Sequence, residues 1–173
     1  MRKKKLAKLK EEKFWASILF YARLPGDLEK IPEHIHHLRC KDAGIDDTWL
    51  EKMVTVVRSI NMLDLDENEI TNKGVLHLTK LESLKELRLK SCGLVNNESL
   101  EYLSQITSLE LLHLGGTSIT IDQLIKLNTL KNLRTILVSS DADNDTVREI
   151  LSPIGNELPA CEFIVNHKLV NLY

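Results

Sequence analysis

Aromatic residues, glycine and proline are scarce in this chain of 173 residues. Aromatics make up 5% of it, and there are only seven glycines and four prolines. A core with so few rings must be built from aliphatic side chains. The three cysteines are too few, and odd in number, for a disulfide framework. No apolar run approaches the roughly 18 residues of a membrane-spanning helix. These absences favour a single globular domain.

Positive charge is concentrated at the start of the chain. Residues 1–10 hold six of the 23 Lys and Arg and no acid, so the other 163 residues carry 17 basic against 25 acidic side chains. A body with a net charge of −8 disfavours binding to bulk polyanions. Glu11 and Glu12 interrupt the basic stretch, and no small-residue cleavage site follows it, so we predict no secretory signal and expect a cytoplasmic protein.

A pattern of apolar residues recurs along most of the chain. The stretch LKELRLKSCGL, residues 84–94, has leucine at offsets zero, three and five. Five other frames, starting at residues 35, 60, 109, 133 and 158, have an apolar residue or Cys at the same offsets. Composition alone would fill about eight of these 18 positions, yet all are filled. Because successive frames start 24 or 25 residues apart, the pattern indicates a structural repeat.

The second half of the unit has its own apolar pattern, with a spacing of three. Three frames carry it, as Val75, Leu78 and Leu81, then Leu100, Leu103 and Ile106, then Leu124, Leu127 and Leu130. This spacing predicts a helix or a 3₁₀ turn. Helix-start residues precede these segments and the equivalent ones, at Asp46 or Asp47, Thr71 or Asn72, Asn96 or Asn97, Thr120, and Asp145. Each unit is thus predicted to be a strand and a helix that bury their apolar faces by stacking.

These frames resemble the leucine-rich-repeat family, whose unit reads LxxLxLxxN/CxL over about 20–29 residues. The resemblance covers residues 35–168 and implies an α/β solenoid, a horseshoe with a parallel β-sheet on its concave face and helices on its convex face. In the family, the residue at offset eight points inward and hydrogen-bonds the turning backbone. Here that position holds Ala43, Asn68, Cys92, Thr117, Asp141 and Asn166. Ala43 cannot make such bonds, so the first turn should be looser. Asp143 and Lys168 replace the apolar residue at offset ten, so the later turns should be irregular.

The two ends of the predicted array differ. Residues 1–34 are interpreted as a basic arm and an N-terminal capping helix over 8–23, and residues 35–173 as six repeats with an incomplete last one. The packed face of the helix is expected to carry Phe14, Ile18 and Tyr21. No capping helix is predicted at the C-terminus. The tail therefore either adds a strand or leaves an open strand edge that allows a weak homodimer.

Side chains between the core positions of each strand point away from the core, so they form the candidate binding surface. We expect a partner to contact Arg39, Lys41, Asp64, Asp66, Arg88, Lys90, Leu111, His113, Leu137 and Ile164. In the first half of this surface, basic and acidic residues alternate between strands about 4.8 Å apart. They form either a solvated charge ladder or a patch that recognises a polypeptide.

The second half of the surface is apolar. Val165 is expected to point outward there beside Leu111, Leu137 and Ile164. An apolar zone with charged neighbours is typical of a protein-binding patch. The alternative is that the C-terminal tail covers it.

Metal-binding patterns are weak. Strand alternation places His34 and His36 on one side and His37 on the other, so at most two of them share an ion. The stretches at 64–68 and 141–145 resemble the start of a calcium loop, but they lack the glycine and the glutamate that complete it. We predict neither a metal site nor a cofactor.

Catalytic motifs are absent, and Cys40, Cys92 and Cys161 are expected to be buried and unreactive. The sequence therefore predicts a non-catalytic scaffold that binds another protein on its concave sheet, as an adaptor, an inhibitor or immunity-type protein, or an assembly subunit. The family resemblance implies the same. No small-molecule substrate is expected. The alternative is a tether to a polyanion or a membrane surface through residues 1–10, although a solvated helix end explains these lysines more simply.

Overall fold

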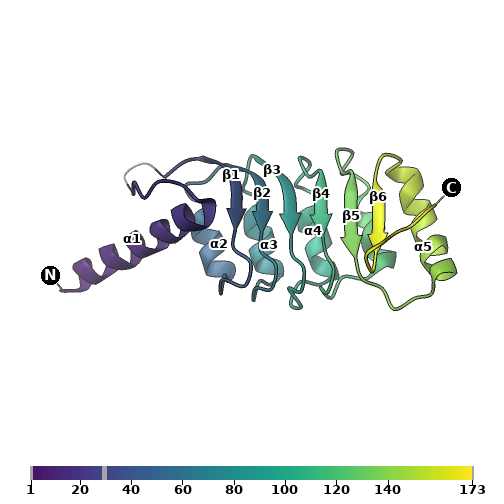
Figure 1. Ribbon diagram of the computed structural model, residues 1–173, viewed down its shortest axis with the longest axis horizontal. Helices are drawn as coiled ribbons and strands as arrows, with labels where there is room; N and C mark the ends of the chain where they lie inside the picture. The colour runs from purple at the N-terminus through teal and green to yellow at the C-terminus, as the bar shows by residue number, and fades with distance from the viewer. Residues whose placement is uncertain (1, 29–30, 173) are drawn as a thin grey trace.

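The computed structural model describes residues 2–28 and 31–172 and has an α/β fold. Seven strands form one sheet in which they lie side by side in chain order (Figure 1). These strands are β1 (His34–Arg39), β2 (Ser59–Asp64), β3 (Ser83–Arg88), β4 (Leu111–His113), β5 (Thr135–Val138), β6 (Glu162–Val165) and β7 (Lys168–Leu169). Strands β1 to β6 are parallel, and β7 is antiparallel to β6.

Helical segments connect the parallel strands. They are α2 (Asp47–Met53), α3 (Asn72–Leu78), η1 (Asn97–Ser99) with α4 (Leu100–Leu103), η2 (Ile121–Leu127) and α5 (Asn144–Glu157). In Figure 1, α2, α3 and α4 lie behind the strands, so the sheet has a helical side and an opposite side. The first helix, α1 (Arg2–Ala22), projects away from the β1 end. Within the described ranges, no helix is long and apolar enough to cross a membrane.

The core lies between the sheet and the helices. All nine residues of the three predicted helical trios are buried, and so are 17 of the 18 strand positions at offsets zero, three and five. The exception is Cys161, which is half-buried. Burying one leucine or isoleucine contributes roughly 1.5–3 kcal/mol. The buried residues form one continuous cluster along the sheet, so each unit depends on its neighbours.

The sixth frame is displaced by two residues from the prediction. Ile136 of β5 lies opposite Phe163, 27 residues further on, whereas a frame starting at 158 would place Cys161 there. Val165 was therefore predicted wrongly as an outward residue, because it is buried. Helix α5 has 14 residues, twice the seven of α2 and of α3, so the chain returns to the sheet later.

Asn68 connects the first two turns of the chain. Its side chain is only 6% exposed, and its Nδ2 donates hydrogen bonds to the carbonyl oxygens of Cys40 (2.7 Å) and Leu65 (2.9 Å). Its Oδ1 accepts hydrogen bonds from the backbone amides of Ala43 (3.2 Å) and Ile45 (2.8 Å). The first turn, which we expected to be loose at Ala43, is thus held by a side chain from the next turn.

The other inward polar positions differ among themselves. The Cys92 thiol donates to the Leu65 carbonyl at 3.2 Å, and the Thr117 hydroxyl donates to a carbonyl of its own turn. Asp141 and Asn166 are exposed, so neither points inward as predicted. Asn166 still bonds to the backbone of a neighbouring turn, because it accepts from the Ser140 amide at 3.2 Å and donates to the Ser140 carbonyl at 2.6 Å.

Polar side chains join the N-termini of neighbouring helices. The first residue of each predicted start pair caps its own helix, as Thr71 does for α3 by accepting from the Lys73 amide. The second residue reaches the cap of the next helical segment. Asp47 accepts from the Thr71 amide at 2.9 Å, and Asn72 accepts from the Asn96 amide at 3.0 Å.

Helix α5 begins differently from the prediction. Asp143, rather than Asp145, is its N-cap, and it accepts hydrogen bonds from the Asp145 and Thr146 amides. Because an N-cap carboxylate binds the amides two and three residues on, Asp143 is better placed than Asp145, which lies within the first turn.

Each end of the sheet carries an added element. Helix α1 starts at Arg2, earlier than predicted, and buries Ile18 in the common core, while Phe14 and Tyr21 are half-buried against it. At the other end, β7 pairs with Ile164 and Val165 of β6. Of the two alternatives for the tail, the added strand is therefore the one found.

Replacing Asn68 with alanine should lower the free energy of unfolding by about 2–4 kcal/mol, because two buried amides and several carbonyls lose their partner. Urea denaturation measures this. The matched variant Asn156→Ala, at an exposed position of α5, should cost less than about 1 kcal/mol. Equal losses in the two variants would contradict the bridging role of Asn68.

Replacing Gly74 with alanine should destabilise the protein by about 1–3 kcal/mol, although alanine favours helices. A Cβ atom at Gly74 would lie 2.5 Å from Cγ2 of Ile70 and from Oδ1 of Asp47, so α3 would have to move away from α2. Gly93 is the control, since a Cβ atom there meets nothing within 4 Å. The midpoint temperature of thermal unfolding should be unchanged or slightly higher in Gly93→Ala than in the wild type.

Candidate binding face

The side of the sheet opposite the helices, here called the open face, carries the outward side chains of the strands. Strand register aligns six of them into one central row, each opposite the next. The central row consists of Arg39, Asp64, Arg88, His113, Leu137 and Ile164. Six of the ten predicted site residues are thus brought side by side. Ile164 takes the place that the sequence frame assigned to Glu162, because β6 is shifted by two residues.

Leu111 belongs to a different row. The first row, two residues earlier in each strand, consists of His37, Met62, Glu86, Leu111, Thr135 and Glu162. Leu111 is half-buried there, between Glu86 and Thr135. It therefore lies apart from the apolar residues of the central row, with which it was grouped.

The predicted charge ladder is not formed by contacting ion pairs. Within the described residues, no carboxylate oxygen lies within 4.0 Å of the Arg39 or Arg88 guanidinium. Lys41 forms an ion pair with Glu67 at 3.0 Å instead of with Asp66, its expected neighbour. Ladder-like pairs occur where the strands begin, as between Arg58 and Glu82 at 3.0 Å. The charges of the central row are consequently open to another partner.

Asp66 was expected to be an outward charge of this surface, in a solvated ladder or in a recognition patch, and it is instead buried. The residue is only 7% exposed, and one of its carboxylate oxygens accepts a hydrogen bond from the Lys90 backbone amide at 2.8 Å. Burial raises the pKa of Asp66, while the Lys90 amide acts against this rise and the nearby Asp64 adds to it. Asp66 therefore supports the chain at Lys90 more than it offers a surface charge.

A hollow of about 210 Å³ lies at the end of the open face formed by β3 to β6. Leu137 and Ile164 line its apolar part, and Gly115 leaves room beside His113. A Cβ atom at Gly115 would lie 3.1 Å from Nε2 of His113, so a side chain there would reduce the space. The hollow is thus formed by four strands and the turns that follow them.

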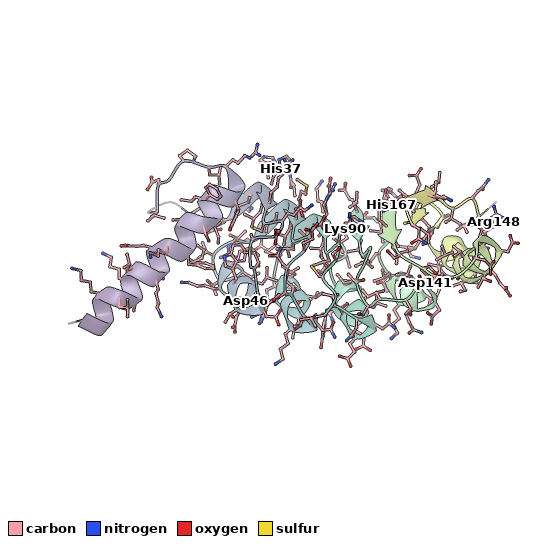
Figure 2. All side chains as sticks on the ribbon, turned by 60° about the horizontal axis from the view of Figure 1, so that its bottom comes forward. His37, Asp46, Lys90, Asp141, Arg148 and His167 are labelled. Carbon is pink, nitrogen blue, oxygen red and sulfur yellow. The ribbon has the colours of Figure 1, made fainter. Side chains whose placement is uncertain are left out.

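Basic groups surround this hollow. Lys90, His113 and His167 all line it, and no carboxylate residue does. Figure 2 shows Lys90 and His167 along the same upper side of the molecule as His37, with Asp46 and Asp141 lower down. Burial lowers the pKa of His113, and the positive charges of Arg88 and Lys90 lower it further.

Arg88 has an unused donor next to the hollow. Its Nε atom is shielded from solvent and has no hydrogen-bond partner among the described residues. A buried donor without an acceptor costs about 1–3 kcal/mol, so this nitrogen is a local cost to the fold.

The sequence frames missed His167 and Asn166 as residues of this site. Both follow β6 with positive φ angles, 67° for His167 and 49° for Asn166, so they form a tight turn beside the hollow. The usable signal was Asn166, because asparagine tolerates the left-handed conformation that such turns require. The two-residue displacement of β6 hid it.

The C-terminal tail leaves the hollow uncovered. After β7 it runs over α5, where Leu172 packs so closely that a Cβ atom on Gly155 would lie 2.6 Å from its Cδ1. Leu137 and Ile164 consequently remain partly exposed. Up to residue 172, where the described part of the chain ends, the tail does not cover the apolar zone, which was one of the two alternatives.

The histidines and cysteines have structural surroundings. Within residues 2–28 and 31–172, no three His, Cys, Asp or Glu side chains are grouped to hold a metal ion. A ring nitrogen of His36 bonds to Asn61 at 3.0 Å. Burial raises the pKa of Cys40 and of Cys161 to about 12, so both thiols are protonated at neutral pH. Cys161, only half-buried, was predicted to be buried.

Comparison with known proteins adds no relative. No family model matches the sequence, and no curated protein matches it. Functional interpretation therefore rests on the open face itself.

The lowered pKa of His113 predicts a pH dependence of stability. The folded-state pKa lies below the ordinary 6.5, so just below pH 6.5 the unfolded chain binds more protons than the folded one. The free energy of unfolding should fall as the pH falls through this window. Urea denaturation on both sides of pH 6.5 should give a smaller difference for His113→Gln than for the wild type.

An independent measurement follows the His113 ring by NMR. Replacing Lys90 with alanine removes a positive charge that lowers the pKa of His113, so this pKa should rise. An unchanged titration in Lys90→Ala would mean that Lys90 does not act on the hollow.

Proposed function

We propose that this protein is a non-catalytic scaffold of the leucine-rich-repeat type that binds another protein on the open face of its sheet. The observation that carries this proposal is the central row, in which six strands align outward side chains that no other described segment covers. An adaptor, an inhibitor or immunity-type protein, or an assembly subunit would use such a face.

The solenoid part of the proposal is supported by the strand spacing. Paired residues of β1 to β5 are 24 or 25 residues apart in the sequence, and the strands follow chain order across the sheet. In a solenoid, each unit contacts only its neighbours, and the sheet forms the concave binding face.

Rigidity supports a binding role. The strands are held from behind by a continuous aliphatic core, and polar bridges such as those of Asn68 fix the turns. A preformed face loses little conformational entropy when a partner docks, so more of the contact energy appears as affinity. The mixture of an apolar hollow and surrounding charge matches the composition of protein interfaces.

The location we propose is the cytoplasm. Cys40, Cys92 and Cys161 are all free, as expected in a reducing compartment.

A second candidate function is attachment to a polyanion or a membrane surface through α1. This helix projects from the body, and Leu6 and Leu9 are 54% and 47% exposed among the exposed lysines of residues 4–10 (Figure 1). The acidic body would repel the same surface, so this function ranks second.

Affinity capture from a native lysate tests the scaffold function. A specific partner should be recovered with the wild type, and its recovery should fall at least about tenfold with Leu137→Arg and with Arg88→Glu. Matched controls lie on η2, on the helical side, where Ile125 and Lys126 are exposed. Ile125→Arg and Lys126→Glu should recover the partner as the wild type does.

Deleting residues 1–10 separates the two candidate functions. A scaffold should keep its partner after this deletion, whereas a tether should lose its surface and weaken steeply as salt is raised. Recovery that is unaffected by Leu137→Arg but abolished by the deletion would contradict the scaffold function.

A further inference from the structure

The apolar part of the hollow is suited to a side chain. Leu137 and Ile164 lie opposite each other on β5 and β6, half-buried, and Gly115 leaves space at one side. The volume of about 210 Å³ is below the roughly 300–1,000 Å³ of a typical small-molecule site. The hollow therefore accepts one small apolar group better than a whole cofactor.

The charge beside this apolar part is positive. Lys90 lines the hollow together with the imidazole rings of His113 and His167, and Arg88 lies opposite His113 in the central row, so Lys90 and Arg88 supply the positive charge. The nearest carboxylate in that row, on Asp64, is two strands from His113, on the order of 10 Å. No carboxylate lines the hollow, and Asp66, which accepts from the Lys90 backbone amide, is buried, so the accessible charge here is positive and complements a negative partner.

Two carboxylates of the open face lie on the other side of the hollow. Glu86 and Glu162 belong to the first row, and neither lines the hollow. From β3 to β6, the face thus changes from negative in the first row to positive at Lys90, whereas Asp64 and Asp66 lie at the end of β2 and in the turn after it. A partner with a negative group is oriented by this change, so that the group lies toward Lys90 and His167.

Hydrogen-bond donors are available in the same place. The Arg88 guanidinium, opposite His113 in the central row, has no carboxylate oxygen within 4.0 Å among the described residues. The Ser139 hydroxyl oxygen accepts a hydrogen bond from the Gly116 amide at 3.1 Å, which leaves its own hydrogen to donate. A carboxylate, with two oxygens and four lone-pair positions, can accept from several such groups at once.

We infer that the occupant of this hollow is an acidic polypeptide segment, with an apolar side chain on Leu137 and Ile164 and a neighbouring carboxylate beside Lys90 and His113. This inference rests on the proposed function and specifies the partner's chemistry. Charge complementarity indicates that the segment carries a negative charge. The apolar surface of Leu137 and Ile164 indicates that it also carries an apolar side chain, which a free anion lacks.

Nucleic acid fits this site less well than an acidic peptide. No Phe, Tyr or Trp lines the hollow, so bases lack the usual aromatic stacking partners. The Gly116 amide is engaged by Ser139, so it is not free to hold a phosphate. A peptide needs neither feature.

Binding of short labelled peptides with blocked ends tests the inference by fluorescence anisotropy. The test peptide alternates Glu with Leu. In one comparison peptide Lys replaces Glu, and in the other Gly replaces Leu. The full-length protein should bind the Glu–Leu peptide at least about tenfold more tightly than either comparison peptide, and more weakly as salt is raised.

Variants locate the peptide on the protein. Lys90→Glu and Leu137→Glu should each weaken binding of the Glu–Leu peptide at least about tenfold, while Lys126→Glu and Ile125→Glu on the helical side should not. Circular dichroism checks that each variant is folded. If Leu137→Glu does not fold, Leu137→Ala tests the same contact without introducing a charge.

Two results would overturn the inference. One is that the Lys–Leu peptide binds as well as the Glu–Leu peptide, or that no peptide binds. The other is that Lys90→Glu and the Leu137 variants leave binding unchanged. If the lysate partner still depends on Leu137 in either case, the proposed function stands without the inference. Conversely, Glu–Leu binding with the expected variants, but no partner lost with Leu137→Arg, supports the inference and contradicts the proposed function.

Discussion

Register between parallel strands is the constraint on which the rest of this structure depends. Each unit contributes only about three apolar residues from its strand and three from its helix, which cannot form a core alone. Pairing with the strand 24 or 25 residues away places these residues beside their equivalents and makes one continuous aliphatic core. Hydrogen bonds from Asn68 and between the helix caps hold the same alignment at the turns.

The alignment that builds the core also decides the open face. Because side chains alternate across a strand, stacking the inward residues necessarily stacks the outward ones. Charges are thereby placed in rows without forming ion pairs, as Asp64 and Arg88 illustrate: they lie opposite each other, yet no ion pair within 4.0 Å joins them. Such a row costs the fold little, and it leaves its interactions available to a partner.

Much of the fold could be predicted because its signal is local. Offsets of three and five identify the strand residues, and Thr71 or Asn96 identifies where a helix begins. The errors come from segments whose length or surroundings changed. Helix α5 is twice as long as α2, so β6 starts two residues late, Val165 turns inward and Cys161 loses part of its cover. Asp66 was misjudged because only the packed turn places its carboxylate under the Lys90 amide.

The sequence by itself determined the strands, the composition of the core and the positions of most outward side chains, since all of these follow from short-range periodicity. Only the tertiary structure decided the basic hollow. Gly115, Leu137, Ile164 and His167 meet there because β6 is displaced relative to the sequence frame, and because the tail pairs at the edge of β6 instead of covering it. Both results depend on contacts between segments that are far apart in the sequence. No local pattern encodes such contacts.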